Sequence, residues 1–213
     1  MELTKHTHAC VSLDKPDGHL LVDPGTFAPN AAELIAHTDT ILITHEHFDH
    51  FDEQAIATAL QARPDLTVYG PAAVVQRWDT RPGQTVTVTD GDEVRAGGFD
   101  ITVFGRWHAV IHRDIPAVAN VGFLIDGEVY HPGDAYHVPP VPVSTLLLPV
   151  SGPWTKLGEA VDYVRAVSPQ RLIQIHEVLL SDIGQQSTQG FLSPAMLSAV
   201  PLTIIPPGET VTL

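Results

Sequence analysis

Cysteine is nearly absent from this chain of 213 residues, since Cys10 is the only one. A single thiol cannot form an internal disulfide, which is typical of proteins in a reducing compartment. The first residues, Met1 to His6, lack the apolar stretch of a signal peptide. No apolar run is long enough to span a bilayer, so neither secretion nor membrane insertion is expected. These absences predict a cytoplasmic protein.

Basic residues are also scarce, because 11 Lys and Arg stand against 25 Asp and Glu, for a net charge of −14. A nucleic-acid-binding surface needs clustered Lys and Arg, so no nucleic-acid partner is expected, and an anionic membrane is disfavoured too. The expected partner is a small-molecule substrate, and a homo-oligomeric state stays open. Hydrophobic residues make up 44% of the chain, which excludes disorder, and the length fits one domain over residues 1–213.

The most informative stretch is an apolar run, residues 41–43, that ends in Thr44-His45-Glu46-His47-Phe48-Asp49-His50. His45 and His47 are two positions apart, so in an extended chain both imidazoles point to one side. Asp49 and His50 follow where the chain must turn, and they can face a second point in space. Imidazole nitrogen and carboxylate oxygen together suit Zn²⁺ and neighbouring ions, which favours a metal site over a solvated polar turn.

The rest of the chain alternates short strands with helices, and we predict the elements from hydrophobic periodicity and turn residues. Helices are expected at 31–36, 53–62, 71–78, 157–167 and 194–200. The polar, Gln-rich stretch 181–193 is expected to be a loop. Strands are expected at 2–13, 20–22, 66–69, 85–89, 93–95, 99–104, 121–125, 128–130, 145–148, 171–175, 203–205 and 209–213.

The pattern His-x-His-x-Asp-His at the end of a hydrophobic strand resembles the signature of the metallo-β-lactamase superfamily of metal-dependent hydrolases. This resemblance implies an α/β protein, a four-layer αββα sandwich of two mixed β-sheets flanked by helices. A finer likeness, to the L-ascorbate-6-phosphate lactonase-like branch, rests on Asn120-Val121-Gly122-Phe123 and Tyr130-His131-Pro132-Gly133-Asp134. The chain lacks the length for the inserted domain of the superfamily's nucleases, and it lacks a fused flavin domain.

The same resemblance implies further metal ligands beyond His45, His47, Asp49 and His50. His108, just past the strand 99–104, matches the third imidazole, although His112 competes for this place. Asp134 in the Gly-Asp pair matches the bridging aspartate, whose two oxygens can hold two cations. His176, at the end of the strand 171–175, matches the last histidine ligand.

Two residues near the start of the chain are candidates for supporting roles. In related sequences an Asp at the position of Asp23 commonly supports the metal ligands, although Asp-Pro-Gly is also ordinary turn chemistry. His8 is a candidate for lining the metal edge, and the alternative is a half-exposed strand histidine. His112 is a third candidate if His108 is the ligand.

The function implied is hydrolysis of a small anionic ester, lactone or phosphoester by a metal-activated hydroxide. One or two transition-metal ions are expected, with Zn²⁺ favoured and Mn²⁺ or Fe²⁺ open. Asp49 is the expected catalytic residue, which orients the hydroxide or shuttles a proton. Arg106, Arg113 and Lys156 lie in loops, and at most one of them is expected to bind substrate. The alternatives are a non-catalytic metal-binding or sensing domain, and a phosphodiesterase or nuclease of the same superfamily.

Overall fold

Two mixed β-sheets form the centre of the computed structural model, which describes residues 1–78 and 80–213. The first sheet has the strand order β14 (Thr210–Thr212), β1 (Glu2–Lys5), β2 (Val11–Lys15), β3 (Gly18–Val22), β4 (Thr40–Leu42), β5 (Thr67–Gly70), β6 (Thr85–Thr87). The second has the order β13 (Leu202–Thr203), β12 (Arg171–Ile175), β11 (Thr145–Pro149), β10 (Val129–His131), β9 (Gly122–Ile125), β8 (Phe99–Phe104), β7 (Glu93–Ala96).

Each sheet is antiparallel in one half and parallel in the other. Strands β14 to β3 and β7 to β10 pair antiparallel, whereas β3 to β6 and β10 to β13 pair parallel. Parallel neighbours need a crossover connection, and most of these connections carry a helix. The helices are α1 (Ala31–Ala36), α2 (Glu53–Ala62), α3 (Ala72–Val75), α4 (Leu157–Val167) and α5 (Asp182–Phe191).

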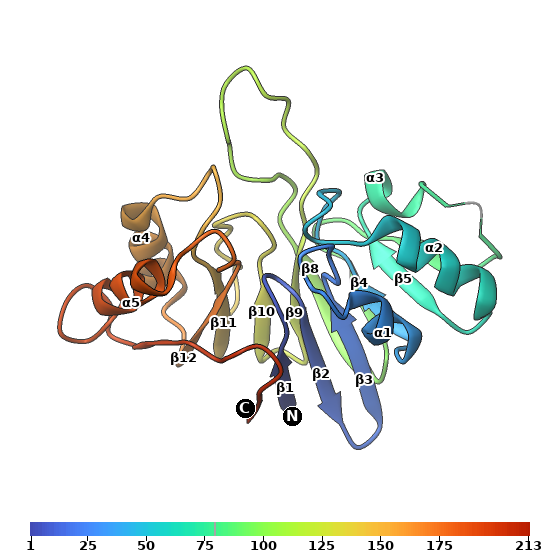
Figure 1. Cartoon of the computed structure of the whole chain (residues 1–213), viewed down its shortest axis with the longest axis horizontal. Coiled ribbons are helices and arrows are strands. Elements are labelled where there is room, and N and C mark those ends of the chain that lie inside the picture. The colour runs from blue at the N-terminus through green and yellow to red at the C-terminus, as the bar shows by residue number, and fades with distance from the viewer. Residues whose placement is uncertain (79) are drawn as a thin grey trace.

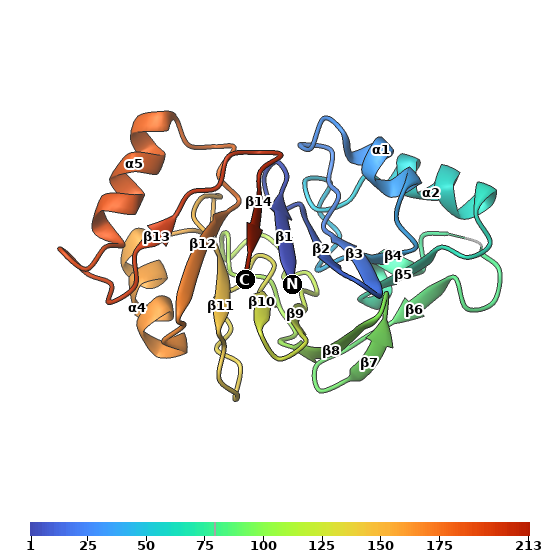
Figure 2. The same ribbon diagram turned by 90° about the horizontal axis from the view of Figure 1, so that it is seen from below.

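The apolar side chains separate into an inner core and two outer cores. The inner core lies between the sheets and takes residues from both, such as Leu13 and Val103. One outer core joins the first sheet to α1 and α2, and the other joins the second sheet to α4. Figure 2 shows α1 and α2 outside one sheet and α4 and α5 outside the other. The four-layer αββα architecture expected from the sequence is therefore confirmed.

Several element bounds agree with the sequence prediction, among them those of α1, α2, α4, β8 and β12. The predicted strand over 2–13 is wrong, because the chain turns between β1 and β2 and His8 adopts a positive φ of 64°. The loop predicted at 181–193 is instead α5, whose N-terminus is capped by the Ser181 side chain. The helix predicted at 194–200 is absent from these described residues, which form turns and bends.

One edge of the sandwich collects the loops that follow β4, β8, β10 and β12. In Figure 1 these loops lie at the top, where the segment after β8 projects as a long loop, and both termini lie at the opposite edge. The turn between β1 and β2 also reaches the loop edge, since the His176 N–H donates to the His8 carbonyl at 3.0 Å. Among the described helices, none has the length and apolar character needed to cross a membrane.

Candidate metal centre

The loop edge brings together all seven residues predicted as metal ligands. They form overlapping groups whose nitrogen and oxygen atoms lie within 4.8 Å of one another. One group contains His45, His47 and His108, and another contains Asp49, His50 and His176 together with His8. Asp134 belongs to a third group, with His45 and His50. The pattern of two histidine groups around one buried carboxylate is the arrangement expected for a two-metal site.

Asp134 stands between the two histidine groups, and each of its oxygens faces an imidazole. Oδ1 lies 3.1 Å from His50 Nε2, and Oδ2 lies 3.3 Å from His108 Nε2 and 3.1 Å from His176 Nε2. A carboxylate in this position can place one oxygen on each of two cations. Asp134 is thus positioned as a bridging ligand.

Three imidazoles use Nδ1 to bind the protein and leave Nε2 facing the cluster. His50 Nδ1–H donates to Asp23 at 2.7 Å, and His108 Nδ1–H donates to the Ala109 carbonyl at 2.6 Å. The Thr44 hydroxyl donates to Asp23 at 2.7 Å, so it accepts the hydrogen bond from His45 Nδ1–H at 3.0 Å. Fixing the proton on Nδ1 leaves Nε2 as a free lone pair, which is the usual state of a metal-binding histidine.

Buried atoms without hydrogen-bond partners test whether these residues fit a metal. His50 Nε2, His176 Nε2 and Asp134 Oδ1 are buried and unpaired. An unpaired buried polar atom costs about 1–3 kcal/mol, so three in one place indicate a missing ligand. His45 Nε2 and His47 Nδ1 lie 3.0 Å apart, close to the roughly 3.3 Å between two ligand nitrogens of a tetrahedral zinc site. The donor set and its geometry therefore fit one or two transition-metal ions.

At His45, His47 and Asp49 the local environment favours the protonation states that bind metal, whereas Asp134 and Asp23 outweigh burial and raise the pKa of His50, so His50 must lose a proton when metal binds. Burial and the neighbouring His50 lower the pKa of His45, and burial and His108 lower that of His47. Burial opposes ionisation of Asp49, but the hydrogen bond from His8 and the nearby His50 outweigh it and lower the pKa of Asp49 to about 2. Neutral imidazoles and an ionised carboxylate are the forms that coordinate cations.

Asp23 supports the cluster from beneath. It is fully buried, and its oxygens accept hydrogen bonds from the Thr44 N–H at 2.8 Å, the Thr44 hydroxyl and His50 Nδ1–H. Asp23 therefore fixes both the strand end that carries His45 and the ring of His50. Its backbone has a positive φ of 48°, a conformation that Asp adopts more readily than most residues.

His8 lies within the second group and orients Asp49. Its Nε2–H donates to Asp49 Oδ2 at 3.1 Å, and its side chain is buried. Glu177 holds the His8 backbone, because Glu177 Oε1 accepts from the His8 N–H at 2.9 Å and from Lys5 Nζ at 3.0 Å. Lys5 is itself only 1% exposed. Sequence reasoning did not find this buried ion pair, because nothing in the pattern distinguishes Lys5 from a surface lysine.

The loop that carries Asp134 is fixed from both sides. The Asp134 N–H donates to Asn120 Oδ1 at 3.0 Å, and Asn120 Nδ2 donates to the Pro132 carbonyl at 2.9 Å. Gly133 has a φ of 62°, and a Cβ there would lie 2.3 Å from Asn120 Oδ1, so only glycine fits. From the other side the Trp154 indole N–H donates to Asp134 Oδ2 at 2.8 Å, a contact that the sequence did not indicate.

The other candidate residues lie away from the cluster. The His112 side chain is 58% exposed and stands beside Asp114 on the projecting loop. Arg106 forms an ion pair with Asp90 at 3.0 Å. The side chains of Arg113 and Lys156 are 88% and 76% exposed, and each has an acidic neighbour within 4 Å. His131 is fully buried, and its Nε2–H donates to the Ala9 carbonyl at 2.9 Å and lies 3.8 Å from Asp23 Oδ2.

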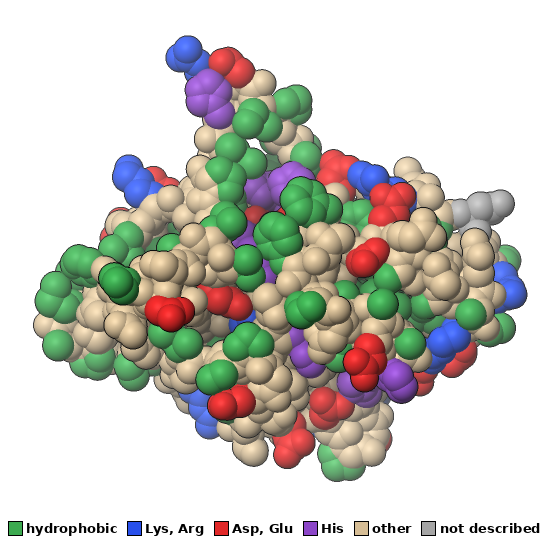
Figure 3. Space-filling view, viewed as in Figure 1, with side chains coloured by type: hydrophobic (Ala, Val, Ile, Leu, Met, Phe, Trp, Pro, Cys, Tyr) green, Lys and Arg blue, Asp and Glu red, His purple; other side chains and the backbone are tan. Residues whose placement is uncertain are grey.

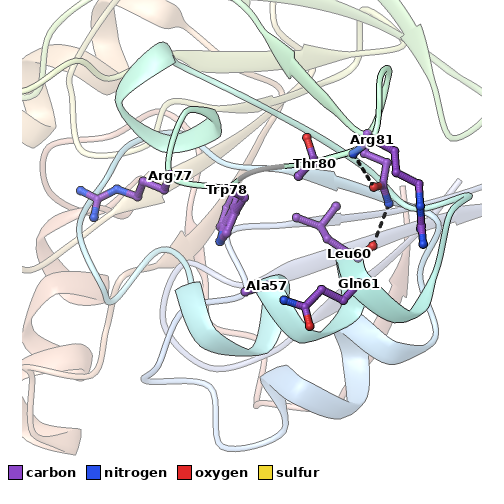
Figure 4. A pocket seen from close by; sticks show the side chains of 8 residues that line it. Ala57, Leu60, Gln61, Arg77, Trp78, Thr80 and Arg81 are labelled. Carbon is purple, nitrogen blue, oxygen red and sulfur yellow. Dashed lines mark hydrogen bonds between the residues drawn. The ribbon is translucent and has the colours of Figure 1, made fainter.

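A separate cavity of about 420 Å³ lies beside α2, between this helix and the segment after α3 (Figure 4). The polar groups of Gln84 are already paired, since its amide donates to the Leu60 carbonyl and its carbonyl accepts from the Arg81 N–H. The residues that line this cavity include no His, Cys, Asp or Glu within the described part of the chain. The metal-ligand chemistry is therefore concentrated at the loop edge.

Two mixed sheets inside four layers, with histidines and aspartates at one edge, define a class of metal-binding αββα proteins. Over residues 2–176 the chain matches the family described as "Beta-lactamase superfamily domain". Protein Rv0786c of Mycobacterium tuberculosis is 37% identical over 187 residues, which cover 85% of this chain and 86% of that protein. The chain thus belongs to the metallo-β-lactamase-fold family of metal-dependent hydrolases, as its sequence motifs had indicated.

Solved structures support the same fold at lower sequence identity. Igni18, a metallo hydrolase from Ignicoccus hospitalis, has a TM-score of 0.74 and 19% identity, covering 100% of this chain and 97% of that one. The metallo-beta-lactamase fold protein YhfI from Bacillus subtilis has a TM-score of 0.71 and 17% identity, covering 99% and 98%. At this level of sequence identity, the similarity establishes only that the helices and strands are arranged in the same way.

Proposed function

We propose that this protein hydrolyses a small ester, lactone or phosphoester at the metal centre, with Zn²⁺ favoured over Mn²⁺ and Fe²⁺. The observation that carries the proposal is the position of Asp134, whose two buried oxygens face histidines of both ligand groups. When bound, the metal ions supply a Lewis acid and lower the pKa of a coordinated water towards neutrality. An entirely structural metal site would have no need for ligands open to solvent, whereas the Asp49 side chain is 18% exposed.

Asp49 is the residue best placed to move a proton. Its Oδ2 accepts a hydrogen bond from His8 Nε2–H, which holds the carboxylate in one orientation. The carboxylate can take the proton of the attacking water and pass it to the leaving oxygen. A pKa lowered to about 2 keeps Asp49 ionised at neutral pH, so its carboxylate can orient the attacking water as a hydrogen-bond acceptor, and any proton that it takes passes readily to the leaving oxygen.

The attraction for an anionic substrate comes from the metal ions rather than from nearby basic side chains. Two divalent cations outweigh the charges of Asp49 and Asp134, whereas Arg106 and Arg113 lie beside acidic partners. The N-terminus of α2 adds little, because its own Asp52 side chain accepts from the Ala55 N–H at 2.9 Å. We propose a small-molecule substrate in the cytoplasm, in keeping with the single cysteine and the net charge of −14.

Turnover by the metal-loaded protein tests the proposal. A panel of lactones, carboxylic esters and phosphodiesters is compared with RNA and single-stranded DNA at low and high salt. We expect at least one small substrate to be cleaved, Asp134→Asn to abolish cleavage, and the exposed His112→Ala to retain it. Cleavage of nucleic acid alone would favour the nuclease alternative. Metal binding without turnover of the whole panel would favour a non-catalytic sensing domain.

A further inference from the structure

An apolar cavity of about 70 Å³ lies directly beside the metal centre. His47 and His108 form one wall, and the other wall belongs to the projecting loop that follows β8. Apart from these two histidines, every residue that lines the cavity is apolar, including Val110, Ile115 and Ala117. In Figure 3 histidine side chains reach the surface at the base of this loop, with hydrophobic side chains beside them.

The base of the projecting loop is held in a fixed relation to the metal ligands. At the base of the loop the His108 N–H donates to the Val118 carbonyl at 3.0 Å, and the Asn120 N–H donates to the Arg106 carbonyl at 3.1 Å. The Ala109 N–H donates to the Asp134 carbonyl at 2.8 Å. A ligand that fills the cavity therefore need not order the base of the loop.

The chemistry of the cavity favours a hydrocarbon group over a phosphate. Val110 is 75% exposed and Ile115 is 51% exposed, so this side of the cavity is open to solvent, and an apolar ligand there would remove apolar surface from water. No Lys or Arg lines the cavity, and the charged pair Arg113 and Asp114 lies at the exposed part of the loop. A phosphoryl group would find no cationic side chain here to hold it.

We infer that this cavity binds the short acyl chain of a carboxylic ester or lactone whose carbonyl lies at the metal centre. A cavity of 150 Å³ accommodates the six carbons of benzene, so one of 70 Å³ holds about three carbons beyond the carbonyl. The inference rests on the proposed hydrolytic function and selects carboxylic esters and lactones among its substrates. Water adds its oxygen to the acyl carbon, the acyl carbon–oxygen bond breaks, and the proton of water passes to the leaving alcohol oxygen.

Chain-length dependence tests the inference with metal-loaded protein and the 4-nitrophenyl esters of acetate, butanoate, hexanoate and decanoate. Each methylene buried in the cavity is expected to raise kcat/KM about fourfold, so the value should rise from acetate to butanoate and level off or fall thereafter. Ala117→Phe fills the cavity and should remove the preference for butanoate over acetate. Ala62→Phe, at an exposed alanine of α2, should keep that preference.

A second pair of variants controls for the possibility that the bulky phenylalanine at position 117 disrupts the loop instead of filling the cavity. Val110→Asp places a charge at the cavity and should lower the butanoate-to-acetate ratio at least fivefold. Ile183→Asp, at a residue of α5 that is 78% exposed, should leave the ratio unchanged. Equal rates for all four esters, or a ratio that neither cavity variant changes, would overturn the inference while leaving the hydrolase proposal intact.

Binding of the product carboxylates separates the two proposals. Ligand-detected nuclear magnetic resonance with metal-loaded protein measures the affinities for acetate, butanoate and decanoate. Butanoate should bind about 15-fold more tightly than acetate, since two further methylenes are buried. If butanoate shows this preference but no ester, lactone or phosphoester is cleaved, the cavity assignment stands and the hydrolytic function fails. Equal affinities for acetate and butanoate would overturn the cavity assignment whatever the turnover.

Discussion

The indole N–H of Trp154 donates a hydrogen bond of 2.8 Å to Oδ2 of Asp134, and both side chains are buried. The same oxygen faces His108 and His176, so the indole helps to decide where the carboxylate can point. Hydrogen bonds to ligand side chains orient them and tune their affinity for metal. Trp154 is therefore a positioning residue for the bridging carboxylate.

Trp154→Phe should weaken metal binding about 10- to 100-fold while the protein stays folded, because the ring is kept and only the N–H is lost. Competition with a chelator of known affinity measures the change, and circular dichroism checks the fold. Trp78→Phe is the matched control, since the Trp78 indole donates to the Glu53 carbonyl at 3.3 Å, on α2. Equal metal affinities in the two variants would show that the contact with Asp134 has no positioning role.

The third imidazole can be assigned by comparing two histidines of the same loop. His108→Ala should lower the metal content by about one equivalent, since it removes one of the nitrogens around one metal position. His112→Ala should leave the metal content unchanged, because its side chain is 58% exposed. Elemental analysis of both proteins after incubation with Zn²⁺ measures the stoichiometry. A loss confined to His112→Ala would reassign the ligand.

Asp23→Asn should weaken metal binding about 10- to 100-fold, because the amide no longer offers His50 Nδ1–H a charged acceptor. A metal titration followed by calorimetry measures this change. Asp14→Asn serves as the control, since Asp14 also pairs with a histidine, His19, but at an exposed site. If the two substitutions lower the affinity equally, the effect comes from the net charge and not from support of His50.

The sequence was sufficient to predict the strands and the seven candidate residues that the structure brings together at the loop edge, because much of the motif is local in the chain. One apolar strand is followed by His45, His47, Asp49 and His50. The ends of neighbouring parallel strands lie at the same edge of a sheet, so residues that follow those strands come close together. Helix α2 was predicted with the bounds it has in the structure because Asp52 caps it and Pro64 follows it. These are signals that a few neighbouring residues determine.

The features that the sequence could not indicate depend on contacts between distant segments. Trp154 reaches Asp134 across 20 positions, and Lys5 reaches Glu177 across 172. The turn at His8 was missed because the residues around it alternate as in a strand, while the His8–His176 backbone contact decides its conformation. Helix α5 was missed because its sequence is mostly polar, contains Gly184 and Gly190, and buries none of its residues.

The buried ion pair between Lys5 and Glu177 gives a prediction about stability. Burial lowers the pKa of Lys5, and the Glu177 carboxylate opposes this shift and keeps the charge paired. Lys5→Met leaves Glu177 with a largely buried, unpaired charge, so the free energy of unfolding should fall by about 3–5 kcal/mol. Urea unfolding of chelator-treated protein measures the loss independently of metal.

Two further variants distinguish the loss of the pair from the loss of a lysine. Lys156→Met removes a lysine whose side chain is 76% exposed and should change the free energy of unfolding by less than about 0.5 kcal/mol. Lys5→Met combined with Glu177→Gln should recover part of the loss, because the amide is neutral and still accepts from the His8 N–H. If the double variant were less stable than Lys5→Met alone, the unpaired charge of Glu177 could not be the cause. Glu177 would then support the turn at His8 through its own hydrogen bonds, independently of Lys5.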